Sequence, residues 1–283
     1  SSTGKRGAAA MLPLLQHRGV QLVGGGWSFF IAENVVLSHN REFVIRSIGD
    51  DNYHRVYNTL SCGACFSIAY GYLRHGRGTG PRVSWSRRPA SRAGALVLQA
   101  LGLVGFSQLV PRLQLPVTLG AVRDKISDAD EHAVAPVADS TVAAPAMKVR
   151  VRCPMDFTPV DMPEDGVHGL LRVTRHPTLW SLGLLGLGSA LATPFATEAV
   201  MFSMPSVFAL IGGAHQDYRY RRGWGGELPE AVDEVTCNVP FIALFSGAQP
   251  WTALFEELKW TNAALAVSAA LLLAGRRRLM PPR

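Results

Sequence analysis

An apolar hairpin with basic residues at both of its ends constrains the fold of this chain more than any other stretch. It opens on RVTRHP at residues 172–177 and closes on YRYRR at residues 218–222. Between these ends lie two apolar segments, 179–192 and 196–210, joined at TPF, residues 193–195. Such a hairpin predicts two helices that cross a bilayer and return to one side. A buried helical hairpin in a soluble protein is the alternative.

Four further apolar runs have the length of membrane spans. They cover residues 19–37, 53–73, 93–110 and 258–275. A helix of about 20 apolar residues crosses the hydrocarbon core of a bilayer. Charged residues make up 17% of the chain, whereas soluble domains usually carry about 25%. The sequence therefore predicts an all-α, multi-pass transmembrane helical bundle of about six spans, with a polar, partly irregular insert.

The predicted spans divide the chain into two membrane parts around the insert. The two membrane parts are helices one to three at 19–113 and helices four to six at 169–275, with the insert at 114–168 between them. A basic N-terminal segment at 1–18 precedes them, and a basic tail at 276–283 follows. The centre of the insert, 128–145, is rich in Ala, Val, Asp and Pro and has no period. It is expected to be extended or partly ordered and to need a partner. A short strand is expected at 149–151, and the apolar run at 239–249 is expected to lie at the membrane interface.

Three polar residues fall inside predicted spans. Glu33 and Asn34 lie in the first span, and Glu198 follows Pro194 in the hairpin. Such groups are costly in lipid and must face protein, water or a cofactor. Glu33 is expected to meet an arginine or asparagine of another helix. Glu33 and Glu198 are interpreted as structural anchors, with catalysis as the alternative.

Two groups of arginines flank the spans and are expected to contact lipid headgroups or a partner surface. The first group, Arg82, Arg87 and Arg88, lies in a loop rich in Gly, Pro and Arg, and the second is Arg219, Arg221 and Arg222. Anionic lipid and nucleic acid both attract arginine clusters. No nucleic-acid-binding module surrounds these residues, so the expected partners are the bilayer and other membrane proteins.

Several motifs, taken in order, resemble one family. The N-terminal set is LSH at 37–39, RE at 41–42, IG at 48–49 and YHRVYNTLS at 53–61. The C-terminal set is RVTRHP at 172–177, GAHQD at 213–217 and NVPFIALFSG at 238–247. The chain resembles the NnrU family of membrane proteins over about 19–110 and 169–275, and within it the plastid zeta-carotene isomerases.

The resemblance implies an all-helical bundle and, for the isomerases, a b-type haem held by two histidines. That haem helps to isomerise a central cis double bond of zeta-carotene. His39 matches one family histidine. The other family position lies about thirteen residues beyond His176, where this chain has Gly188-Ser189-Ala190. None of these side chains is a good iron ligand.

The missing histidine leaves two functions open. The favoured interpretation is a member that has lost catalysis and serves as an accessory structural subunit of a photosynthetic or respiratory membrane complex, with bound lipid, carotenoid or chlorophyll. The alternative is a haem b-dependent carotenoid isomerase in which His176 or His215 replaces the second ligand. No separate metal site is predicted.

The composition of the first residues predicts an organelle protein. The start of the chain is rich in Ser, Ala and Arg and poor in acidic residues, like the end of a transit peptide. The expected location is the plastid thylakoid or the mitochondrial inner membrane.

Overall fold

The computed structural model of the chain describes residues 16–109, 117–121, 147–151, 166–224 and 226–279. Within these ranges the regular structure is helical, apart from one pair of strands. A long helix covers each of the six apolar runs, and several are long and apolar enough to span a membrane. The predicted all-α, multi-pass membrane fold is therefore confirmed.

The helices fall into a long set and a short set. The long helices are α2 (Arg18–His39), α4 (Asp50–Gly71), α5 (Pro89–Leu109), α6 (Pro177–Ala192), α7 (Ala196–Tyr220) and α11 (Trp260–Leu279). The short elements are α3 (Arg41–Ile48), η1 (Tyr72–Gly76), η2 (Trp85–Arg87), η3 (Gly169–Arg172), α8 (Glu230–Val235), α9 (Ile242–Phe245) and α10 (Trp251–Glu257). The short elements connect the long helices at their ends.

Prolines define where the central hairpin begins and turns. Pro177 occupies the first turn of α6, where its missing N–H costs no helical hydrogen bond. Thr193 has extended backbone angles (φ −83°, ψ 142°) because it precedes Pro194, which disfavours the helical region for its neighbour. The chain then enters α7 after Phe195, so the predicted two-helix hairpin is confirmed.

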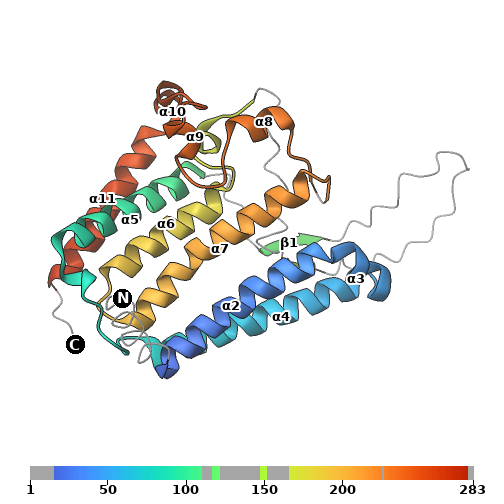
Figure 1. Cartoon of the computed structure of the whole chain (residues 1–283), viewed down its shortest axis with the longest axis horizontal. Coiled ribbons are helices and arrows are strands. Elements are labelled where there is room, and N and C mark those ends of the chain that lie inside the picture. The colour runs from blue at the N-terminus through green and yellow to red at the C-terminus, as the bar shows by residue number, and fades with distance from the viewer. Residues whose placement is uncertain (1–15, 110–116, 122–146, 152–165, 225, 280–283) are drawn as a thin grey trace, which may run out of the picture.

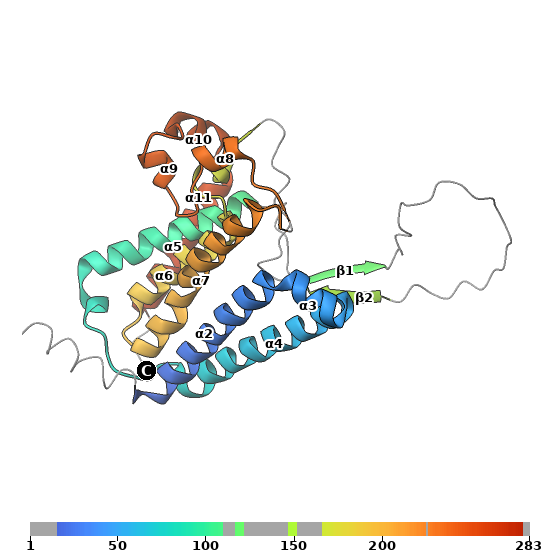
Figure 2. The ribbon, with the colours of Figure 1, turned by 45° about the vertical axis from the view of Figure 1, so that its right-hand side comes forward.

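The six long helices lie side by side in an order that differs from their order in the chain (Figure 1). Each packs against the next in the series α4, α2, α7, α6, α5, α11. Figure 2 shows the same arrangement with the α2–α4 hairpin brought forward. Helices α2, α5 and α7 end at the same end of the bundle, which we call the histidine end. The opposite end, where the 72–88 connection runs, is the loop end.

Small residues allow close contact between α5 and α6. A Cβ at Gly102 would lie 2.6 Å from the backbone nitrogen of Leu185. One at Gly188 would lie 2.7 Å from the carbonyl oxygen of Ala95. Small residues at these positions let helix backbones approach, as is usual between membrane helices.

The buried aromatic core lies between α2, α4, α6 and α7. Its rings include Phe30, Tyr53 and Phe208, and the centroids of Phe30 and Phe208 are 5.3 Å apart. The outer helix α11 instead exposes large apolar side chains, with Leu265 67% and Leu272 75% exposed. Apolar surface on this scale suits contact with lipid.

By length and composition, three of the described helices can cross a membrane: α2, α5 and α7. A fourth span is possible if α10 and α11, which are bent by 89° to each other, count as one. Helix α6 has only 16 residues, and α4 is not among the candidates. Six crossings therefore stay a prediction.

The described residues of the insert form an antiparallel strand pair. Strand β1 (Val117–Ala121) pairs with β2 (Met147–Val151), with Val117 opposite Val151. The strand expected at 149–151 is thus confirmed, and it begins two residues earlier. The predicted irregular centre at 128–145 lies outside the described residues. The 239–249 run holds only the four-residue helix α9, which is too short to cross a bilayer.

Candidate functional site at the histidine end

The RVTRHP segment is held against the NVPF segment by backbone and side-chain hydrogen bonds. Arg175 N donates to the carbonyl of Cys237 at 3.0 Å, and Phe241 N donates to that of Val173 at 2.9 Å. Trp180 Nε1 donates to Asn238 Oδ1 at 2.9 Å. Asn238 Nδ2 in turn donates to the carbonyl of Leu210 on α7, at 3.0 Å. Two motifs that lie far apart in the chain thus form one connected structure.

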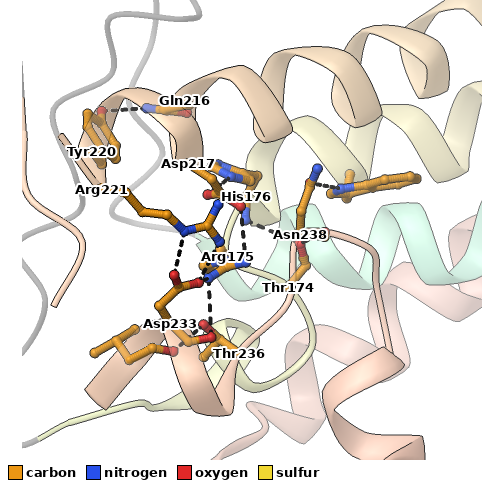
Figure 3. A network of polar contacts seen from close by, with 12 residues as sticks. Thr174, Arg175, His176, Gln216, Asp217, Tyr220, Arg221, Asp233, Thr236 and Asn238 are labelled. Atoms are coloured by element: carbon orange, nitrogen blue, oxygen red, sulfur yellow. Dashed lines mark hydrogen bonds and ion pairs between the residues drawn. The ribbon is translucent and has the colours of Figure 1, made fainter. Parts of the chain in front are cut away.

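Asp217 of α7 anchors a buried charge cluster beside these segments (Figure 3). Its Oδ1 lies 2.8 Å from His176 Nε2, and its Oδ2 lies 3.1 Å from Arg175 Nη2. The side chain of Asp217 is only 5% exposed, that of His176 9% and that of Arg175 8%. Buried charges are tolerated when they are paired in this way, and removing one partner is costly.

Asp233 of α8 continues the cluster towards the surface. It forms ion pairs with both Arg175 and Arg221, and Arg221 Nη2 lies 2.7 Å from its Oδ1. The hydrogen bond from Arg221, aided by that from Arg175, lowers the pKa of Asp233 to about 2. The cluster therefore joins the start of α6, the end of α7 and helix α8 through charged groups.

This cluster accounts for one ring nitrogen of His176. Its Nε2 faces Asp217, and its Cδ2 lies close to where a Cβ of Gly213 would be, at 2.7 Å. The Nε2 of His176 is therefore not available to an iron atom, and Nδ1 is the ring nitrogen that could still bind one, because ligating histidines commonly direct their other nitrogen at a carboxylate. The His39–His176 ligand pair stays a prediction.

His39 and His215 lie against each other on the neighbouring helices α2 and α7. Their ring centroids are 5.9 Å apart, with an angle of 43° between the planes. The ring of His39 is also 5.9 Å from those of Tyr218 and Trp224. Arg222 lies over the Tyr218 ring, 3.6 Å from its centroid. This group, which we call the His39 cluster, joins two of the three predicted ligand candidates.

The His39 cluster contains a buried nitrogen with no hydrogen-bond partner. His215 Nε2 is inaccessible to solvent and has no partner among the described residues. A buried polar atom without a partner costs free energy, so its retention suggests a ligand. The ring of His39 beside it is exposed at the end of α2. The buried Nε2 of His215 therefore lies on a ring that packs beside an exposed imidazole.

The donor set suits a haem better than a bare metal ion. In the part of the chain that the structure describes, no three His, Cys, Asp or Glu side chains group to hold a metal ion. A haem supplies its own equatorial nitrogens and needs only axial ligands from the protein. His39 and His215 can supply these two ligands, and Tyr218 and Trp224 provide aromatic surface beside them.

The position where the resemblance places the second ligand is filled by helix packing. Gly188 leaves no room for a side chain next to Gln99 of α5, whose backbone nitrogen would lie 2.8 Å from an added Cβ. Ser189 accepts a hydrogen bond from Gln99 Nε2 at 3.1 Å. A histidine at residue 188 would require α5 and α6 to separate.

The polar residues inside predicted spans bind neutral groups. Glu33 Oε1 accepts hydrogen bonds from Ser61 Oγ at 2.7 Å and Asn34 Nδ2 at 2.8 Å, and Tyr57 OH donates to Asn34. The partner of Glu33 on another helix is thus Ser61. The prediction that Glu33 meets an arginine or asparagine of another helix was therefore wrong. Glu198 accepts from Gly78 N at 2.9 Å and from Thr193 Oγ1. These contacts favour structural roles.

The six candidate arginines separate to opposite ends of the bundle. Arg219 is 4% exposed and donates to Ser38 Oγ at 2.6 Å, at the histidine end. Arg221 pairs with Asp233, and Arg222 stacks on Tyr218. The remaining three, Arg82, Arg87 and Arg88, are exposed at the loop end. Arg219 is therefore buried, whereas the other five, including Arg221 and Arg222, are exposed, and Arg82, Arg87 and Arg88 also lack an ion pair with a described residue.

Sequence reasoning missed the acidic partners and the aromatic neighbours of the histidines. Asp217 stands in the GAHQD motif two residues after His215, and that spacing places the two side chains on different faces of one helix. Asp233 lies in the acidic 227–238 segment. Trp224 follows the last turn of α7. The GAHQD motif was a usable signal for Asp217. No sequence motif near Asp233 or Trp224 indicates which residues they contact.

The fold and this site define a polytopic helical membrane protein that carries a buried Arg–His–Asp cluster and an adjacent histidine pair at one end of its bundle. The family model described as "NnrU protein" matches residues 21–277, so the chain belongs to the NnrU family. No curated protein and no solved structure matches it.

Proposed function

We propose that this NnrU-family membrane protein binds a b-type haem through His39 and His215 and acts on a carotenoid as a cis–trans isomerase. The observation that carries the proposal is the 5.9 Å approach of the two rings, combined with the buried, partnerless Nε2 of His215. The pair is an alternative to the family position near residue 189, which is occupied by helix packing.

The helix faces beside the pair suit an apolar substrate. Val36 lies one turn before His39 and is 56% exposed, and Ile211 lies one turn before His215 and is 41% exposed. A long hydrocarbon in the bilayer can lie along these faces and reach the His39 cluster without crossing a polar surface. When bound, the haem would supply an iron centre that assists rotation about a central cis double bond, as the resemblance implies.

The second candidate is an accessory subunit that has lost catalysis. It is favoured by the tight packing of Gly188 and Ser189 against α5, which occupies the family ligand position. The exposed leucines of α11 provide a surface for neighbouring subunits, lipid or pigment. Under this proposal the chain belongs to an organelle membrane complex, of the thylakoid or the mitochondrial inner membrane.

One experiment separates the two candidates. The chain is purified in mild detergent, and absorption spectra are recorded in the oxidised and reduced states for the wild type, His215→Ala and the control His54→Ala. His54 is a histidine of the same end that lies 3.5 Å from Asp50 and packs its ring beside Tyr53. We expect a Soret band and sharp reduced bands at one haem per chain, lost in His215→Ala and kept in His54→Ala.

A wild-type protein without haem that runs inside a much larger particle would overturn the haem proposal and favour the subunit. A wild-type haem signal that persists in His215→Ala, with altered band positions in His176→Ala, would show that the wrong second ligand had been chosen. Circular dichroism of each variant separates loss of haem from loss of fold.

A further inference from the structure

A dense group of arginines lies at the loop end of the bundle, away from the His39 cluster. Helix α2 begins there, η1 and η2 lie there, and α5 starts there, at the lower left of Figure 1. The exposed cations on these elements are Arg18, Arg74, Arg77, Arg82, Arg87, Arg88 and Arg92. Elements that are distant in sequence thus present one cationic surface, which we call the arginine surface.

Nothing within the described residues neutralises this surface. None of its seven arginines forms an ion pair with a described residue. The only acidic residue described at this end is Glu198, whose carboxylate accepts hydrogen bonds from Gly78 N and Thr193 Oγ1. Seven like charges with one acidic neighbour repel one another, so a binding partner with negative charge would stabilise the surface.

The loop that carries the arginines is held in place by the central hairpin. Val83 N donates to the carbonyl of Pro194 at 2.9 Å, and Ala196 N donates to that of Pro81 at 2.9 Å. Arg82 pairs in an isolated bridge with Phe195, and its guanidinium carbon lies 6.0 Å from the Phe195 ring centroid. The arginines are therefore presented from a fixed backbone, which reduces the ordering cost of binding.

Exposed apolar side chains lie on the same elements as the arginine surface or at the end of α4 next to them. Leu73 is 67% exposed, Tyr70 is 51% exposed and Trp85 is 38% exposed. Tyrosine and tryptophan beside arginine are typical of the membrane–water interface, where the ring meets the headgroup level. A partner with an anionic part and an apolar part fits both the arginines and the exposed apolar side chains.

We propose that the arginine surface binds the headgroups of anionic phospholipids. The charge of the surface matches the phosphate, and Leu73, Tyr70 and Trp85 match the glycerol and acyl region. Each arginine at a membrane surface contributes roughly a fivefold gain in affinity for anionic lipid, about 1 kcal/mol. The proposal concerns the opposite end from the haem site and does not depend on the proposed function.

The test measures lipid binding to the detergent-purified full chain by native mass spectrometry and by thermal shift, with dioleoylphosphatidylglycerol and dioleoylphosphatidylcholine as probes. We expect phosphatidylglycerol to bind preferentially and to raise Tm. The double variant Arg87→Gln/Arg88→Gln should bind it roughly 30-fold more weakly. The matched control Arg46→Gln/Arg55→Gln removes two exposed charges at the histidine end and should bind like the wild type.

Two outcomes would overturn the proposal. One is equal binding of the two lipids by the wild type. The other is an equal loss of phosphatidylglycerol binding in the two double variants, which would indicate an effect of net charge alone. Inorganic phosphate at matched concentration should not reproduce the shift in Tm, because the apolar contacts are then absent. If it did, the site would be an anion site and not a lipid site.

Discussion

The two ends of the bundle use arginine in different ways. At the histidine end, Arg172 binds Glu257 at 2.7 Å, and Arg175 and Arg221 share Asp233. At the loop end, Arg87 and Arg88 are exposed and have no carboxylate partner among the described residues. Similar arginine-rich sequences thus stabilise the fold at one end and present charge at the other. The difference depends on which acidic residues the tertiary structure brings near, and not on the number of arginines.

The largest effect is expected from Asp217→Asn at the histidine end. This change leaves Arg175 and His176 buried without their carboxylate, so the free energy of unfolding should fall by about 3 kcal/mol or more. Thermal or SDS denaturation followed by far-UV circular dichroism measures it. The matched change Glu198→Gln at the loop end replaces a carboxylate that binds neutral groups and should cost about 1 kcal/mol. Equal losses would contradict the comparison of the two ends.

A smaller effect is expected from the titration of Asp233. Its pKa falls from an ordinary value of 3.8 to about 2 in the folded chain because of Arg221 and Arg175. A depressed folded pKa stabilises the protein above the ordinary value, and this stability is lost as the pH falls from about 4 to about 2. The loss should be roughly 2 kcal/mol. Stability measured against pH should flatten over this interval in Asp233→Asn, and an unchanged profile would argue against the ion pairs.

The smallest effect is expected from Arg87→Gln/Arg88→Gln in detergent without added lipid. Because these side chains have no ion pair in the described structure, the free energy of unfolding should change by less than about 0.5 kcal/mol. Chemical denaturation of the variant and wild type measures it. A larger loss would mean that the arginines stabilise the fold as those of the histidine end do.

The long helices were predictable because their apolar runs are continuous. The ends were predicted less well, and α7 shows why. Its apolar run ends at residue 210, but the helix continues to Tyr220. The added turns carry Gln216, Asp217 and Arg219, which are polar and yet buried, with hydrogen-bond partners on neighbouring segments or within the helix. Burial of such residues depends on partners that a hydropathy pattern does not reveal.

The candidate site was predictable in part. His39, His176 and His215 were all identified from motifs, and all three lie at the histidine end. What the sequence did not decide was which of them pair. That choice depends on α2 lying beside α7, which no local pattern indicates. The short helices α3 and α10 were missed because they are too brief to show a clear period.

The position of α2 between α4 and α7 also determines when the site can form. The α2–α4 hairpin leaves the ribosome well before α7, because His39 and His215 are 176 residues apart in the chain. Chains fold from the N-terminus during synthesis, and contacts over such separations form late. The side of α2 that contacts α7 therefore stays uncovered until the second half of the chain is inserted. Under the proposed function, a haem held by His39 and His215 would bind only after this step, so its loading would be one of the last steps in assembly.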